Sequence, residues 1–187
     1  DLGGGLGIPY DPDSPVPPAP TAYADMVKDV FQDLGCKLIF EPGRMIAGNA
    51  GVLLSELLYA KMGEERTFYI LDAAMNDLAR PAMYDAYHGI LPVTERTTSP
   101  DTVADFVGPV CETGDTFARK RATHTLTAGE LVVLRSAGAY GAVMASTYNS
   151  RPLVPEVLVR GGSYHVIRKR QSVEDLIALD SLPDWLA

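Results

Sequence analysis

Cysteine is scarce in this sequence: the chain contains only Cys36 and Cys111, which lie far apart. Two distant cysteines argue against a disulfide scaffold and favour a reducing, cytoplasmic setting. Long apolar runs are also missing, so no segment reaches the length needed to span a bilayer, and no signal-peptide pattern is present. We therefore expect a cytoplasmic protein that does not cross a membrane.

An excess of basic charge is absent as well, because the formal net charge is −8. Nucleic-acid surfaces normally carry clustered lysine and arginine, so we expect no nucleic-acid partner. The three histidines, His88, His124 and His165, lack the spacing of metal ligands, and we expect no metal site. The remaining composition, 47% apolar and 21% charged residues, is typical of a globular protein with a substantial core.

Residues 1–50 alternate between helical and extended patterns, which is typical of an α/β barrel or a doubly wound sheet. Residues 1–10 read as a strand end followed by a glycine-rich turn. Apolar residues then recur at helical spacing over 23–34, and Gly35 stands where a C-terminal cap would lie. The short apolar run 37–40 predicts a strand that ends at a loop.

The rest of the chain consists of short β-rich runs bounded by turn residues. Residues 52–62 fit either a helix or a strand, but 67–71 is strand-like, and the two could form a hairpin. Further strands are predicted at 106–111, 130–134, 156–160 and 163–168. Gly161-Gly162 predicts a two-residue hairpin turn, and Ser172 is the expected N-cap of a short C-terminal helix.

Five motifs contain residue types that are suited to binding and catalysis. In chain order they are Gly3-Gly4-Gly5-Leu6-Gly7, Glu41-Pro42-Gly43-Arg44, the run from Asp72 to Tyr84, Cys111-Glu112-Thr113-Gly114-Asp115, and Gly138-Ala139-Tyr140-Gly141 followed by Tyr148-Asn149-Ser150-Arg151-Pro152. Each motif taken alone is explained equally well by an ordinary turn, a surface ion pair or a buried cysteine.

The first two motifs are suited to an anionic ligand. Glycine amides after a strand end can approach a phosphate closely and adopt dihedral angles that side chains forbid. Such loops commonly hold phosphate at the C-terminal rim of barrel strands. Glu41 and Arg44, three residues apart, suit a ligand that has both a cationic and an anionic end.

The other motifs offer a carboxylate-binding arginine, a thiol and a tyrosine. Pro81 suits the first turn of a short helix, from which Arg80 and Tyr84 would project on one face. An arginine fork can bind a carboxylate in bidentate fashion. The acid next to Cys111 suits a thiol that acts as a proton donor better than one that acts as a nucleophile. Tyr140, flanked by glycines, can present its hydroxyl to a pocket.

In this order the motifs resemble one family, the fold-type III pyridoxal-phosphate-dependent decarboxylases, and most closely the diaminopimelate decarboxylases. The resemblance rests on the stretches DLGGGLGIPY, EPGR, DAAMNDLARPAMYDAYH, CETGD and GAYGAVMASTYNSRP. It implies decarboxylation of meso-2,6-diaminopimelate to L-lysine and CO2, the last step of lysine biosynthesis. It also implies that 1–50 form the last strands of a (β/α)8 barrel, followed by a mostly β domain with a short terminal helix over 51–187.

The resemblance implies pyridoxal 5'-phosphate as the cofactor. The residues that it assigns to cofactor binding are Gly3, Gly4, Gly5, Glu41, Gly43, Arg44 and Tyr140. The glycine amides would hold the phosphate, with Gly4 the best single candidate, and Tyr140 would reach the phosphate. Glu41 would keep the pyridine nitrogen protonated, and a protonated ring accepts the electrons left when CO2 departs.

The resemblance also implies roles toward the substrate. The residues concerned are Arg44, Arg80, Tyr84, Glu112, Tyr140 and, for catalysis, Cys111. Arg44, Arg80 and Tyr84 would grip the carboxylate that does not react, and Glu112 would recognise the distal amino group. Cys111 would donate a proton to the α-carbon. Since Cys111 and Glu112 are supplied to the other subunit's site, a homodimer with a shared active site is expected.

Two features depart from the family pattern. Thr113 stands where the family usually has serine, a mild change that keeps a hydroxyl. The Schiff-base lysine of the family lies in an N-terminal half that is not part of this sequence, and the lysines present match no such motif: Lys28, Lys37, Lys61, Lys120 and Lys169. We therefore expect that this portion is inactive alone and partners the N-terminal half of the same enzyme.

Two alternatives remain open. A relative that acts on ornithine, arginine or carboxynorspermidine would not need the paired grip of Arg44 and Arg80, because those substrates lack the distal carboxylate. A non-catalytic binding homologue would be expected to have lost Cys111 or Glu41, and both are present.

Overall fold

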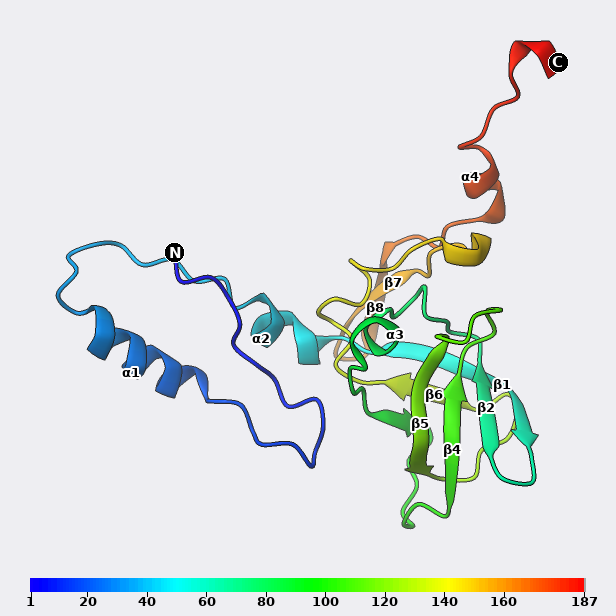
Figure 1. Cartoon of the computed structure of the whole chain (residues 1–187), viewed down its shortest axis with the longest axis horizontal. Coiled ribbons are helices and arrows are strands. Elements are labelled where there is room, and N and C mark those ends of the chain that lie inside the picture. The colour runs from blue at the N-terminus through cyan, green and yellow to red at the C-terminus, as the bar shows by residue number, and fades with distance from the viewer. Residues whose placement is uncertain (187) are drawn as a thin grey trace.

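A six-stranded sheet forms the main packed part of the chain in the computed structural model, which describes residues 1–186, and it lies at the lower right of Figure 1. Its strands are β1 (Leu53–Met62), β2 (Thr67–Leu71), β3 (Ile90–Pro92), β4 (Thr102–Val107), β5 (Thr116–Thr123) and β6 (Leu131–Leu134). They lie in the order β3-β6-β1-β2-β4-β5. Neighbours run antiparallel except β2 and β4, which are parallel. The predicted mostly β domain is thereby confirmed.

The segment that was ambiguous between helix and strand is β1, and it forms a hairpin with β2. Its side chains alternate between faces, as a strand requires: Ser55 and Leu57 are buried, while their neighbours along the strand are exposed. Leu57 lies opposite Leu71 and both are fully buried. The predicted hairpin is therefore confirmed.

The hydrophobic core is built from the strands of this sheet. Buried side chains from all six strands contribute to it, among them Leu57, Tyr69, Phe106 and Val132. The rings of Tyr69 and Phe106 pack edge to face with their centroids 5.4 Å apart. The Tyr69 hydroxyl is satisfied at its far end, where it accepts a hydrogen bond from Leu126 N at 3.0 Å.

Two strands were not predicted, and one predicted strand ends early. β3 was not predicted because it is very short and ends in proline. β5 was not predicted because it is rich in charged residues (TFARKRAT). The prediction of a strand over 106–111 is wrong beyond Val107. There the chain turns instead, with Gly108 N donating to Asp115 O at 3.0 Å.

The N-terminal residues 1–50 contain helices α1 (Pro20–Phe31) and α2 (Gly43–Ala47) and the 3-10 turn η1 (Gly48–Ala50). The predicted helix is confirmed as α1, which lies away from the sheet at the blue end of the chain in Figure 1. Its C-cap is Gln32, so the prediction of Gly35 as the cap is wrong. The strands expected near residue 2 and at 37–40 are not formed. Extended backbone pairs there instead: Leu2 N donates to Ile39 O at 3.0 Å, and Glu41 N donates to Gly3 O at 2.8 Å. The barrel portion of the predicted fold is thus not visible in this chain.

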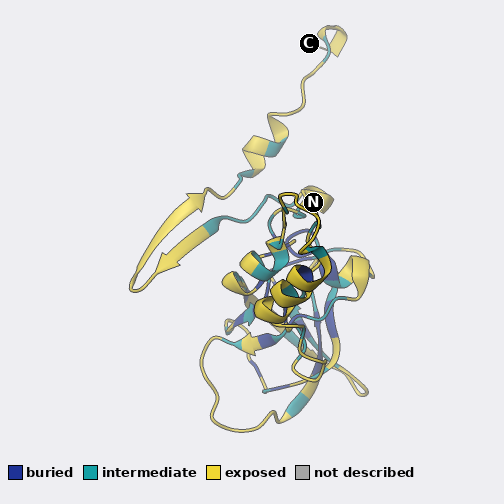
Figure 2. Ribbon diagram, turned by 90° about the vertical axis from the view of Figure 1, so that its left-hand side faces the viewer, coloured by how far each residue is buried: buried dark blue, intermediate teal, exposed yellow. Residues whose placement is uncertain are grey.

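The C-terminal residues form a separate hairpin followed by short helical turns (Figure 2). The elements are η2 (Tyr148–Ser150), β7 (Glu156–Arg160), β8 (Ser163–Arg168), α4 (Val173–Ile177) and η3 (Asp184–Leu186). The predicted Gly161-Gly162 turn joins β7 to β8. Ser172 caps α4 as predicted, since its hydroxyl accepts from Asp175 N while the Asp175 carboxylate accepts from Ser172 N.

The remaining helix, α3 (Arg80–Tyr84), follows the loop after β2 and begins with the predicted Arg-Pro pair. No helix among residues 1–186 is both long and apolar enough to cross a membrane.

Candidate functional site

The glycine-rich turn at the N-terminus lies directly against the Glu41 backbone. Gly3 and Gly5 have φ angles of +68° and +92°, and a Cβ on either would meet nothing within 4 Å. A Cβ on Gly4 would collide with the carbonyl oxygen of Glu41. The turn therefore needs glycine for two different reasons: left-handed backbone at its flanks and close packing at its centre.

Gly43, Arg44 and Tyr140 extend this group of residues. Gly43 N donates to Glu41 O at 2.8 Å and begins α2. The Arg44 guanidinium lies 5.6 Å from the centre of the Tyr140 ring. Tyr140 itself has a φ of 58°, an uncommon conformation for a bulky residue. We refer to Gly3, Gly4, Gly5, Glu41, Gly43, Arg44 and Tyr140 together as the glycine-loop cluster.

Arg44 contains an unsatisfied polar atom. Its Nε is buried and has no hydrogen-bond partner among the residues that the structure describes. Buried donors are normally paired, so an orphan of this kind needs an explanation. A bound acceptor beside the glycine loop would satisfy it.

Arg80 is buried at the start of α3, with 9% of the residue exposed. Its Nη1 lies 3.0 Å from His88 Nε2, and its guanidinium carbon lies 4.4 Å from the centre of the Tyr10 ring. Within residues 1–186 no carboxylate forms an ion pair with it. Tyr84 was expected to share its face, but it is 63% exposed and makes no hydrogen bond to Arg80.

His88 is fully buried and bonded at both ring nitrogens. Besides Nε2 toward Arg80, its Nδ1 lies 2.8 Å from the carbonyl oxygen of Arg135. Burial lowers the pKa of His88 below its ordinary value of 6.5, and the nearby charges of Arg80 and Arg121 act in the same direction. His88 thus connects Arg80, a predicted site residue, to the backbone at Arg135.

Tyr10 and His88 were not among the predicted site residues. Each closes a stretch that carried the family resemblance, since Tyr10 ends DLGGGLGIPY and His88 ends DAAMNDLARPAMYDAYH. That position was the only signal for either residue. Tyr10 connects the glycine loop to Arg80, and its ring also packs edge to face on His88 at 5.5 Å.

Cys111 and Glu112 lie on an exposed loop over 108–115, which we call the cysteine loop. The Glu112 carboxylate is oriented by two donors: Gly114 N at 3.0 Å and the Tyr148 hydroxyl at 3.2 Å. Among residues 1–186, no hydrogen bond, ion pair or ring contact joins Cys111 or Glu112 to the glycine-loop cluster or to Arg80. The structure therefore divides the predicted site residues into separate groups.

Asp115 fastens the cysteine loop to the loop that precedes Arg80. Its buried carboxylate accepts Met75 N at 2.7 Å through Oδ1 and Val110 N at 2.8 Å through Oδ2. Burial raises the pKa of Asp115 above its ordinary value of 3.8, although both backbone hydrogen bonds oppose the shift. The carboxylate thus bridges the cysteine loop and the loop that leads into Arg80.

Arg151 reinforces the same region. Its Nε donates to Asn76 Oδ1 at 3.1 Å, its Nη2 donates to Asp72 O at 2.5 Å, and Nη2 lies 3.8 Å from Asp77 Oδ2. Burial raises the pKa of Asp77, which accepts Ala74 N at 2.9 Å. Arg151 is therefore a structural residue of the 72–79 loop.

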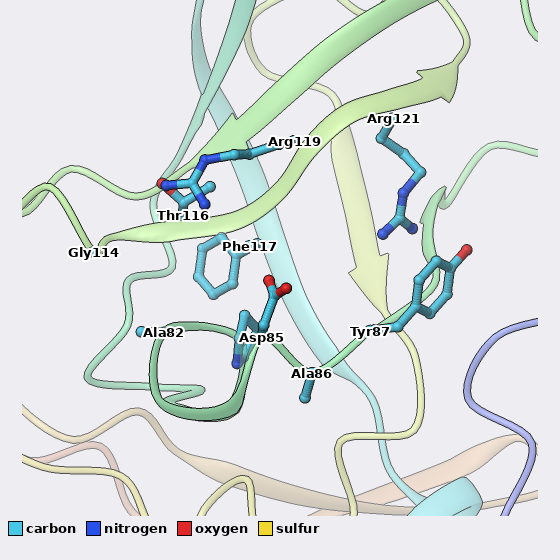
Figure 3. Close-up of a pocket in the computed structure, with 10 residues that line it drawn as sticks. Ala82, Asp85, Ala86, Tyr87, Gly114, Thr116, Phe117, Arg119 and Arg121 are labelled. Atoms are coloured by element: carbon cyan, nitrogen blue, oxygen red, sulfur yellow. The ribbon is translucent and has the colours of Figure 1, made fainter.

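Two cavities adjoin these loops, and neither is lined by the glycine-loop cluster. One of about 640 Å³ lies between α3 and β5 (Figure 3). On it Arg121 is directed toward the Tyr87 ring, with the guanidinium carbon 4.0 Å from the ring centre. The other, of about 340 Å³, is bordered by Glu112, Thr113 and Arg119.

Neither a buried lysine nor a metal-binding group is found among the described residues. Every lysine is exposed at the surface: Lys28, Lys37, Lys61, Lys120 and Lys169. Over the described part of the chain, no group of His, Cys, Asp and Glu is placed to hold a metal ion.

Comparison with known proteins gives a consistent result. Residues 10–138 match the family described as pyridoxal-dependent decarboxylase, C-terminal sheet domain. A curated relative from Zymomonas mobilis, named diaminopimelate decarboxylase, is 55% identical over 186 residues; the alignment covers 100% of this chain and 44% of that protein. The chain thus spans less than half the length of the curated relatives it matches.

Solved structures of two relatives are similar in fold. Diaminopimelate decarboxylase from M. jannaschii, in co-complex with L-lysine, aligns with a TM-score of 0.92 and 36% identity over 100% of this chain and 43% of that one. The enzyme of the same name from Helicobacter pylori, complexed with L-lysine, aligns with a TM-score of 0.85 and 40% identity over 95% of this chain and 43% of that one.

Proposed function

Because this chain belongs to the pyridoxal-dependent decarboxylases, we propose that it is the C-terminal portion of an enzyme that decarboxylates meso-2,6-diaminopimelate to L-lysine. One observation carries the choice of substrate: the buried Arg80 guanidinium faces a neutral imidazole and an aromatic ring, and no carboxylate pairs with it within residues 1–186. A buried cation of this kind calls for an anionic partner. The second carboxylate of diaminopimelate would be that partner.

The glycine-loop cluster fits pyridoxal 5'-phosphate. The open glycine positions leave space for a phosphate beside their amides, and the buried Arg44 Nε needs an acceptor. When bound, the cofactor's protonated ring supplies the electron sink for loss of CO2. Glu41 would keep the ring nitrogen protonated, and Tyr140 would contact the phosphate and the substrate.

Arg44, Arg80 and Tyr84 would hold the carboxylate that remains in the product. The exposed position of Tyr84 leaves its hydroxyl accessible to a substrate or to another chain. Substrates such as ornithine or arginine have no carboxylate at that end, so a buried Arg80 would remain unpaired on binding them. The chemistry of the site therefore favours diaminopimelate over these alternatives.

Cys111 and Glu112 would act in the site of a second subunit. Both are exposed, and neither contacts the glycine-loop cluster or Arg80 within residues 1–186. In a homodimer the cysteine loop could enter the partner's site, where the thiol would protonate the α-carbon and Glu112 would bind the distal amino group. Residues 1–50 would belong to the cofactor-binding barrel in the cytoplasmic holoenzyme.

The test is CO2 release by the complete enzyme that contains this chain. With pyridoxal phosphate, meso-diaminopimelate should be converted to lysine and CO2, whereas ornithine and arginine should release little. A carboxynorspermidine assay covers the remaining alternative. Faster turnover of any of these three than of diaminopimelate would contradict the proposed substrate, and no turnover of any would indicate a non-catalytic homologue.

A further inference from the structure

We propose that His88 is a positioning residue, which holds the Arg80 guanidinium in place for the substrate's remaining carboxylate and does so only as a neutral imidazole. The inference rests on the proposed function, because Arg80 is the carboxylate-binding residue of that proposal. His88 itself would not touch the substrate, since it is fully buried behind Arg80.

The contacts of His88 fix its tautomer. A guanidinium has only donors, so Nε2 must accept the hydrogen bond from Arg80 Nη1 at 3.0 Å. Nδ1 then carries the proton and donates to the carbonyl oxygen of Arg135 at 2.8 Å. Both bonds are satisfied by one neutral form, and this form leaves the remaining donors of Arg80 available for a carboxylate.

Burial and two nearby cations oppose protonation of His88, and together they outweigh the hydrogen bond to the Arg135 carbonyl, which acts in the opposite direction. Arg80 lies against the ring from α3, and Arg121 of β5 donates from Nη1 to the His88 carbonyl oxygen at 3.0 Å. The Tyr10 ring covers the imidazole edge to face. Arg135 contributes its carbonyl, and neither Arg80 nor Arg121 has a carboxylate ion-pair partner within residues 1–186. Burial and both cations therefore lower the pKa of His88.

Protonation would have a direct consequence for Arg80. The imidazolium has no acceptor, so the 3.0 Å hydrogen bond would be lost and two cations would face each other. Arg80 would leave its place, and affinity for a carboxylate would decrease. Since the pKa of His88 lies below 6.5, this loss should occur on the acidic side of that value and not above it.

Two variants separate positioning from packing. His88→Asn places its amide near the Nδ1 position, so it can keep the bond to Arg135 O but cannot reach Arg80. His88→Gln reaches the Nε2 position, so its oxygen can accept from Arg80, and it does not titrate. His165→Asn, at an exposed position of β8, is the matched control.

The readout is equilibrium binding to the cofactor-loaded complete enzyme, using L-lysine and 1,5-diaminopentane as probes. The two ligands differ only in one carboxylate, and neither titrates between pH 5 and pH 8. Titration of the cofactor or of other groups should affect both ligands alike, so the ratio of their affinities reports the carboxylate contact. In parallel, the KM and kcat of diaminopimelate decarboxylation are measured across the same pH range.

We expect His88→Asn to weaken lysine roughly tenfold, the size of one hydrogen bond to a charged group, and to leave diaminopentane unchanged. His88→Gln should bind lysine nearly as well as the parent enzyme and should lose the acidic decline of the affinity ratio. The KM for diaminopimelate should follow lysine binding, while kcat changes less. The His165→Asn control should match the parent.

Equal weakening of both ligands, or identical effects of Asn and Gln, would mean that His88 only supports the fold, and would overturn the proposal. If His88→Asn does not fold, the parent enzyme decides: its His88 ring should show an Nδ1–H tautomer by ¹⁵N NMR, and its affinity ratio should decline in acid. The other tautomer, or a flat ratio, would equally overturn it. An enzyme that neither decarboxylates diaminopimelate nor binds lysine would contradict the proposed function, and the inference with it.

Discussion

Arg80 combines burial, an aromatic neighbour and a neutral hydrogen-bond acceptor, an arrangement that stabilises a guanidinium without neutralising it. The planar group stacks near the Tyr10 ring, and its fork remains able to bind two oxygens at once. An ammonium group can reproduce neither contact. The identity of this cation, and not only its charge, should therefore matter for binding.

Replacing Arg80 by lysine tests this expectation. Arg80→Lys in the complete enzyme should raise the KM for diaminopimelate roughly 10- to 150-fold. This factor corresponds to about 1.5–3 kcal/mol of lost binding free energy, since a bidentate contact to a charged group is removed. Steady-state kinetics measure the effect. Arg160→Lys, on the exposed strand β7, is the control. An unchanged KM would show that Arg80 does not bind the substrate.

Cys111 is the second residue whose role can be tested alone. Cys111→Ala should slow turnover roughly 10²- to 10⁴-fold, the usual contribution of a positioned general acid. The absorbance of the bound cofactor should hardly change, because the thiol would contact the reacting carbon and not the phosphate. The exposed Cys36 provides a matched control as Cys36→Ala. Full activity of Cys111→Ala would contradict its assignment.

The individual site residues differ in how far the sequence revealed them. The glycines at 3–5 and the Glu41-Pro42-Gly43-Arg44 turn belong to short local motifs, and the structure brings them together. The contact of Arg80 with Tyr10 joins distant parts of the chain, and no local pattern predicts it. The contact between His88 and Arg80 depends on the fold around them, and the spacing of the histidines along the chain does not predict it.

At the scale of elements, Asp115 is the residue that holds two loops together. Each of its carboxylate oxygens accepts one backbone amide, from Met75 on one loop and from Val110 on the other. An amide side chain has only one oxygen and would turn its NH2 toward the second donor. Both loops depend on the same carboxylate for their relative position.

Asp115→Asn should therefore destabilise the chain by about 1–3 kcal/mol, the penalty for leaving a buried donor unsatisfied. Urea denaturation measures the loss in the free energy of unfolding. Amide hydrogen exchange at Met75 and Val110 shows whether these two amides lose protection. Asp184→Asn, in the exposed C-terminal turn, is the control. Unchanged exchange at both amides would show that Asp115 does not hold the loops.

The same residue predicts a pH dependence. Because burial raises the pKa of Asp115 above 3.8, the folded state retains its proton to higher pH than the unfolded state. Stability should decrease as pH rises from 3.8 through the folded-state pKa, and should level off above it. The part of this pH dependence of stability that comes from Asp115 should be absent from Asp115→Asn. Burial also raises the pKa of Asp77, so the part that comes from Asp77 should remain in that variant. Denaturation at a series of pH values measures both.

Helices and strands were predicted correctly where a short stretch of sequence contains the pattern that defines them. The hairpins β1–β2 and β7–β8 were found because turn residues separate two apolar runs. β5 was not predicted because its sequence is rich in charged residues. Its buried residues are identified as part of a strand only by their pairing with β4 in the folded structure. β2 and β4 pair in parallel although they are not consecutive in the chain. No short turn motif connects them, so the local sequence does not predict this pairing.

At the scale of the whole molecule, the chain is expected to be inactive by itself. All its lysines are exposed, and none lies in the glycine-loop cluster. Mixing the purified chain with pyridoxal phosphate and diaminopimelate should release no CO2, whereas the complete enzyme should. Release by the chain alone, abolished in its Cys111→Ala variant, would contradict this prediction.

The β7–β8 hairpin is a two-stranded sheet, so both of its outer edges offer unpaired backbone groups within the described structure, and its side chains are exposed. Such edges invite strand addition between molecules. Arg160 ends β7, and Lys169 and Arg170 directly follow β8, whereas Arg168 forms an ion pair with Glu156 at 2.7 Å. The positive charges of Arg160, Lys169 and Arg170 at the hairpin should disfavour the addition of another copy there. Salt screens the repulsion between these charges. Preparations of the purified chain should consequently keep better in dilute buffer than in concentrated salt, with turbidity rising as ionic strength increases.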